Sequence, residues 1–164
     1  MNALTVGSTM TKSLVIDSCI IIAFIHPDIK LLDFVTQNIG DIYINSITLK
    51  EELEDHKDML RHMSYTLIED NIEDMCLARQ MNGPTSFHDN LQMLSCLKYG
   101  YTCVTNDRDL INLCKKNSVN VMWGLELIIE LVKTKIITKD RATTMFSKSG
   151  IDKRYLCRLF PDAG

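Results

Sequence analysis

Carboxylate residues recur close to the points where short apolar runs of the sequence end. Asp17 directly follows the run LVI, Glu51 lies just after the run IYI, and Asp107 comes soon after the run TCVT. Asp89 opens the apolar stretch that precedes TCVT. Oxygen ligands with few His or Cys neighbours suit Mg²⁺ or Mn²⁺ rather than zinc. Two such ions about 4 Å apart can activate water and stabilise the leaving oxygen of a phosphoryl displacement. The four acids therefore predict a site for Mg²⁺ or Mn²⁺ that suits phosphoryl displacement.

Each acid also has a structural interpretation as the cap of a helix. The segments TLKE, which ends at Glu51, and SFHD, which ends at Asp89, both fit a capping box. Asp17 and Asp107 fit ordinary turn or N-cap positions. Glu52 could replace Glu51 at the site if the helix is rotated by one residue. Capping explains each acid taken singly, whereas the set favours a shared cation, because converging carboxylates would otherwise repel one another.

Strands alternate with helices along the chain, which favours a parallel α/β sheet. Short strands are predicted at about 13–17, 42–44, 101–105 and 119–122. Helices are predicted at 18–26, 28–38, 48–67, 72–81, 86–99, 107–116, 125–132, 138–146 and 153–160. In the helix 86–99, the residues expected to face inward are Leu91, Leu94, Cys96 and Leu97. Ligands of an open parallel sheet bind at the carboxyl ends of its strands, so the acids are expected to meet at that edge.

Length and composition indicate one soluble domain spanning residues 1–164. The chain is 46% hydrophobic and 24% charged, close to an ordinary globular protein. The longest uncharged apolar stretch, 18–26, is about half of a membrane span, and the N-terminus lacks the pattern of a secretory signal. The six cysteines show no C-x-x-C or zinc-site spacing. They favour buried thiols in a reducing compartment, so we expect a cytoplasmic protein without membrane contact.

Positive charge is concentrated at the C-terminal end of the sequence. Residues 1–132 carry 10 Lys and Arg against 18 Asp and Glu, whereas residues 133–164 carry 8 against 3. Basic residues of this extension could contact phosphates of a nucleic acid; the candidates are Lys148, Lys153, Arg154 and Arg158. The alternative is that they form the solvated faces of amphipathic helices.

Three segments carry a resemblance to a known family. They read LVIDSCIIIAF, IYINSITLKEEL and SFHDNLQMLSCLKYGYTCVTNDRDL, and in this order they resemble the PIN domain, a family of metal-dependent ribonucleases that includes the VapC-like toxins. The resemblance covers about residues 13–124, leaving 125–164 as a helical, basic extension. It implies a three-layer sandwich, with a parallel central sheet of four to five strands and helices on both faces.

The resemblance implies roles for particular residues of this chain. The family's four acids fall on Asp17, Glu51, Asp89 and Asp107, which would bind Mg²⁺ or Mn²⁺ and catalyse RNA hydrolysis by a metal-activated water, leaving 5′-phosphate and 3′-hydroxyl ends. Secondary site residues would be Asp109, Ser18, Thr105 and Asn106. The chain departs from the family pattern at Cys19 and at His88. A histidine beside an acid is more often a local hydrogen-bond partner than a catalytic group.

Other functional classes are less well supported by the sequence. No Walker lysine loop or G-x-G-x-x-G occurs, and Asp17 lacks the partners that receiver and haloacid-type phosphotransfer domains require. The alternative to a nuclease is a non-catalytic PIN-like module that binds RNA or protein. If the chain is a toxin, the resemblance implies an antitoxin partner and a homodimer as further expectations.

Overall fold

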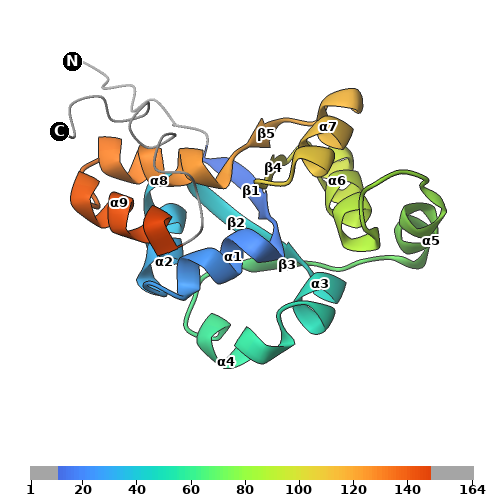
Figure 1. Ribbon diagram of the computed structural model, residues 1–164. Helices are drawn as coiled ribbons and strands as arrows, with labels where there is room; N and C mark the ends of the chain where they lie inside the picture. The colour runs from blue at the N-terminus through green and yellow to red at the C-terminus, as the bar shows by residue number, and fades with distance from the viewer. Residues whose placement is uncertain (1–10, 149–164) are drawn as a thin grey trace, which may run out of the picture.

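A five-stranded, fully parallel β-sheet forms the centre of residues 11–148, the part of the chain that the computed structural model describes (Figure 1). Its strands are β1 (Lys12–Ile16), β2 (Gly40–Asn45), β3 (Thr66–Ile68), β4 (Thr102–Val104) and β5 (Val121–Met122). They lie in the order β3-β2-β1-β4-β5. Strand β1 is therefore central, and the chain moves outward first on one side of it and then on the other. The structure confirms the predicted α/β class.

Helices cover both faces of this sheet. Their bounds are α1 (Ser18–Ile25), α2 (Lys30–Asn38), α3 (Ser46–Glu51), α4 (Lys57–Leu60), α5 (Ile72–Gln80), α6 (Phe87–Tyr99), α7 (Arg108–Lys116), α8 (Gly124–Lys133) and α9 (Lys139–Lys148), with a short 3-10 helix η1 (Glu54–His56) between α3 and α4. None of these helices combines the length and apolarity needed to cross a membrane. The helix predicted at 153–160 lies outside the described residues.

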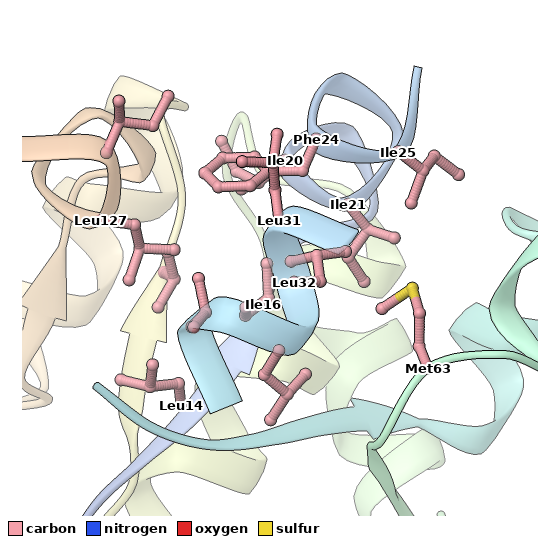
Figure 2. Packing of buried hydrophobic residues seen from close by; sticks show 14 of the residues in the cluster. Leu14, Ile16, Ile20, Ile21, Phe24, Ile25, Leu31, Leu32, Met63 and Leu127 are labelled. Carbon is pink, nitrogen blue, oxygen red and sulfur yellow. The ribbon is translucent and has the colours of Figure 1, made fainter. Parts of the chain in front are cut away.

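The alternation of side chains along the strands divides the core into two layers. Leu14 and Ile16 of β1 belong to a cluster with α1, α2 and α8, whereas Val15 belongs to a second cluster with α6 and α7. Figure 2 shows the first cluster, in which side chains of α1 and α2 lie over Leu14 and Ile16. Successive residues of a strand point to opposite faces, so the buried part of β1, residues 14–16, must be apolar at every position, whereas Lys12 at the start of the strand is exposed. This accounts for the continuous run LVI in the sequence.

The prediction of one long helix over 48–67 is wrong. The structure has α3, η1, α4 and the edge strand β3 in this stretch. Leu53, Leu60 and Met63 are buried, as their helical spacing suggests, but they lie on three separate short segments of one core cluster. Leu67 belongs to β3, which pairs with β2 through the register Ile44 with Leu67. Tertiary pairing overrides the local periodicity here.

The inward face of α6 also differs from the prediction. Leu91 and Cys96 are buried, whereas Leu97 is 51% exposed. Three polar residues of α6, Asn90, Gln92 and Ser95, are buried as well. Gln92 donates from Nε2 to the carbonyl oxygen of Val15 at 3.1 Å, and a buried amide with such a partner loses little on leaving water. Apolar spacing in the sequence does not predict a face of this kind.

Cysteines are distributed differently from the expectation. Cys96, Cys103 and Cys114 are buried in the second core cluster. Cys19 and Cys76 are exposed, although both lie in apolar stretches of the sequence. Partial burial of the Cys19 thiol, within an otherwise exposed residue, raises its pKa, and the neighbouring Asp17 raises it further. The apolar neighbours along the chain therefore do not decide which cysteines are inside.

Substitution of Gly40 is expected to weaken the central pairing of the sheet. Gly40 pairs with Lys12 across β1 and β2, and a Cβ atom at Gly40 would lie 2.2 Å from the backbone oxygen of Lys12. Since backbone cannot move aside cheaply, Gly40→Ala should lower the free energy of unfolding by about 1–3 kcal/mol. The urea midpoint measures this loss, with exposed Asp41→Ala as control. Equal midpoints for the two variants would contradict the close packing of β1 on β2.

Candidate active site

Asp17 and Thr105 meet at the point where the order of the strands reverses. Asp17 directly follows β1 and Thr105 directly follows β4, which are neighbours in the sheet. After β1 the next strand lies toward one edge of the sheet, and after β4 the next strand lies toward the other edge. Thr105 Oγ1 donates to Asp17 Oδ2 at 2.9 Å and accepts from the backbone N–H of Asp107 at 3.0 Å. One hydroxyl thus joins the ends of two strands to the start of α7. A reversal of strand order is the position at which open α/β sheets bind ligands.

The Asp17 carboxyl is buried among like charges. The residue is 8% exposed, and burial raises the pKa of its carboxyl to about 6, against the opposing effect of the Thr105 hydrogen bond. The negative charges of Asp89 and Glu52 raise this pKa further. Among the described residues, no Lys or Arg forms an ion pair with Asp17. A cation at this position would therefore relieve an unfavourable buried charge.

Asp89 and Asp107 are both held by the first turns of their helices. Asp89 forms the capping box that the sequence suggests, because Asp89 Oδ2 accepts from the N–H of Ser86 at 2.9 Å and the N–H of Asp89 donates to Ser86 Oγ at 3.1 Å. Asp107 caps α7 through Oδ1, which accepts from the N–H groups of Asp109 and Leu110 at 2.8 and 3.1 Å. Capping and proximity to Asp17 occur together at Asp89, so the two interpretations of that residue are compatible.

The two glutamates at the end of α3 have different surroundings. The negative charge of Glu52 raises the pKa of the Asp17 carboxyl. Glu51 lies elsewhere, with Oε2 at 3.0 Å from Nε2 of His88. The capping box suggested for TLKE does not form, because α3 begins at Ser46 and its N-cap is Asn45. The sequence favours Glu51 for the site, whereas the electrostatics of the structure favour Glu52.

A set of polar residues that the sequence analysis missed anchors the N-terminal end of α3. Asp70, just beyond β3, accepts from the N–H of Ile47 at 2.9 Å, from Ser46 Oγ at 3.1 Å and from Asn45 Nδ2 at 2.7 Å. Asn45 Nδ2 also lies 2.7 Å from Ser95 Oγ of α6. Asn45 follows the run IYI, so the rule that singled out Asp17 could have found it. Asp70 could not be found, because β3 itself was not predicted.

The secondary site residues divide into neighbours of Asp17 and more distant groups. Thr105 is fully buried, and Ser18 is buried with Oγ at 3.5 Å from Asp17 Oδ1. Asn106 instead accepts from the N–H of Gly124 at 3.0 Å, tying the end of β4 to the start of α8. Asp109 is exposed and contributes its backbone N–H to the cap of α7. The first two are therefore the ones that surround the buried carboxyl.

The basic residues proposed to contact RNA lie outside the described side chains: Lys148, Lys153, Arg154 and Arg158. Two earlier basic residues of the same extension form ion pairs. Lys133 pairs with Glu130 at 3.1 Å, and Arg141 pairs with Asp28. These two contacts favour the structural interpretation for Lys133 and Arg141.

The acids are not gathered as tightly as the sequence analysis expects. Within residues 11–148, no group of three or more His, Cys, Asp or Glu side chains is arranged to hold a metal ion. The caps on α6 and α7 each engage one carboxylate oxygen and restrain Asp89 and Asp107. Mg²⁺ commonly uses only one or two protein carboxylates and keeps several waters. The buried Asp17 carboxyl, on which the negative charge of Asp89 acts, fits an open site of this kind.

The chain shares its fold with a protein of known structure. The chain is similar to a PilT N-terminus domain protein from the hyperthermophilic archaeon Sulfolobus solfataricus P2, with a TM-score of 0.51 and 14% sequence identity over 70% of this chain and 89% of that one. No family model matches the sequence. No curated protein matches it either. The architecture is therefore PIN-like, as the resemblance of the motifs implies.

Replacing Asp17 by Asn is expected to stabilise the metal-free protein. The rise in the carboxyl pKa from 3.8 to about 6 means that the folded state binds this proton more tightly than the unfolded chain. Stability contributed by the protonated form is present below pH 4 and is lost as the pH rises through 6. The full shift corresponds to about 3 kcal/mol at neutral pH, so Asp17→Asn should raise the free energy of unfolding at pH 7.5.

Urea unfolding at pH 7.5 and pH 4.5 measures this effect, with exposed Asp41→Asn as the matched control. The gain from Asp17→Asn should shrink at the lower pH, where the native carboxyl is mostly protonated. A gain that is absent at pH 7.5, or equal at both values, would show that Asp17 is not a buried and destabilised charge.

Proposed function

We propose that this chain is a Mg²⁺- or Mn²⁺-dependent endoribonuclease of the PIN type. The observation that carries the proposal is the buried Asp17 carboxyl at the reversal of strand order. Burial and the negative charges of Asp89 and Glu52 raise the pKa of this group. Strongly perturbed carboxyl groups in such a position are typical of functional sites. The PIN-like architecture supports the same conclusion.

In this proposal Asp17 and Asp89 would hold the ion, with Glu52 and Asp107 acting through water. When bound, the ion would supply an activated water and stabilise the charge on the leaving oxygen. The chain's own residues orient these groups. Thr105 fixes the direction of the Asp17 carboxylate by donating to Oδ2, and the caps of α6 and α7 fix Asp89 and Asp107. Glu52 takes the place for which the sequence favours Glu51.

RNA as substrate rests on the resemblance of the motifs, and so do a role as a toxin, an antitoxin partner and a homodimer. The phosphate contacts proposed for the basic extension belong to the same hypothesis. The rival is a PIN-like module that binds RNA or protein without cleaving it. The absence of a closed three-ligand group among residues 11–148 is the observation that favours this rival.

Cleavage of a single-stranded, end-labelled RNA with millimolar Mg²⁺ or Mn²⁺ tests the proposal. Asp17→Asn and Asp89→Asn should each lower the cleavage rate by about 100-fold or more, as expected when a group that stabilises the transition state is removed. Glu52→Gln should lower it more than Glu51→Gln does, because Gln at position 51 can still accept from His88. Asp41→Asn is the control for the loss of an exposed charge.

The outcomes separate the two functions. Cleavage by Asp17→Asn at the rate of the unsubstituted chain would remove the proposed site. RNA binding without cleavage, together with a melting temperature that millimolar Mn²⁺ does not raise, would favour the non-catalytic module, since an ion bound only by the folded state must stabilise it.

A further inference from the structure

His88 links the two helices that carry acids of the site. It lies in the first turn of α6, immediately before Asp89. Its ring contacts α3 through both nitrogens, with Nε2 at 3.0 Å from Glu51 Oε2 and Nδ1 at 3.4 Å from Thr48 Oγ1. The His88 side chain is 17% exposed and that of Glu51 is 48% exposed. Two contacts from one planar ring fix both the position and the orientation of the imidazole.

The residues that His88 contacts are those that support Glu52. The carbonyl oxygen of Thr48 accepts from the N–H of Glu52 at 2.9 Å and from the N–H of Leu53 at 3.2 Å. Glu51 is the last residue of α3, directly before Glu52. Leu53 is fully buried and anchors the following turn in the core. Glu52 therefore lies between Glu51, whose side chain contacts His88, and Leu53, whose side chain is held by the core.

Helix α3 needs such external contacts because it is short. It has six residues, whereas isolated helices shorter than about 12 residues are marginal in water. Asp70 holds its N-terminal end through Ile47 and Ser46, and His88 holds its C-terminal end. Glu52 and Asp17 repel one another when both carboxyl groups are ionised. The contact between Glu51 and His88 holds the end of α3 against that repulsion.

We infer that His88 is a positioning residue, which holds the end of α3 through Glu51 and Thr48 and thereby keeps Glu52 beside Asp17 and Asp89. The expected effect on metal binding rests on the proposed function, whereas the restraint of α3 rests on the contacts of His88 alone. Glu51 becomes the residue through which His88 acts rather than a ligand.

Hydrogen exchange of the Glu52 and Leu53 amides tests the structural part without any metal. Loss of one hydrogen-bonded partner, worth about 1 kcal/mol, should speed local exchange about fivefold in Glu51→Ala and in His88→Ala. Glu51→Gln retains an acceptor and should restore slow exchange. Glu54→Ala is the matched control, because it removes an exposed glutamate that pairs with Lys57 on the next segment. The double variant Glu51→Ala/His88→Ala should exchange no faster than the faster single variant.

Mn²⁺ affinity tests whether the placement of Glu52 is what matters. Glu51→Ala should weaken binding about tenfold, the lower end of the effect of losing an outer partner of a metal ligand. In a Glu52→Gln background the same substitution should have no further effect. Exchange rates in Glu51→Ala that equal those of the unsubstituted chain would overturn the inference. A tenfold loss of Mn²⁺ affinity caused by Glu51→Ala in the Glu52→Gln background would also overturn it. Failure of the unsubstituted chain to bind Mn²⁺ would contradict the proposed function instead, and the exchange rates would still decide the role of His88.

Discussion

Burial of one carboxyl group, that of Asp17, determines how the rest of the site must be built. The group lies at the end of the central strand β1, inside the protein, with two other acids acting on it. Thr105 donates a hydrogen bond of 2.9 Å to the Asp17 carboxyl, and the Ser18 hydroxyl lies 3.5 Å from its other oxygen. Water would solvate this carboxylate better than the protein does. A fold that retains such a group at a reversal of strand order is suited to binding a cation there.

Each surrounding element restrains an acid through contacts of its own rather than through Asp17. Helices α6 and α7 hold Asp89 and Asp107 by capping bonds. Helix α3 is anchored by Asp70 at one end and by His88 at the other, which brings Glu52 near the buried carboxyl. Like charges approach one another only where other interactions hold their backbones. On the inward side of α6, the buried Gln92 and Ser95 tie this helix to Val15 of β1 and to Asn45 of β2.

The sequence predicts the parts of this arrangement that depend on local pattern. The buried run LVI, the capping box at SFHD and the cap at Asp107 follow from residues within a few positions of one another, and all three are present. The sequence does not predict what depends on pairing between distant segments. Strand β3 forms because β2 is available to it, and Asp70 acts only once β3 exists. The choice between Glu51 and Glu52 depends on His88, 36 or more positions away.

The titration of the Asp17 side chain, followed by carbon NMR of its carboxyl group, tests the central claim most directly. In the absence of divalent ions the midpoint should lie near pH 6. Saturating Mg²⁺, which is diamagnetic, should move the midpoint to lower pH, because a bound cation favours the charged form. A midpoint near the ordinary value of 3.8, or one that Mg²⁺ leaves unchanged, would contradict the account.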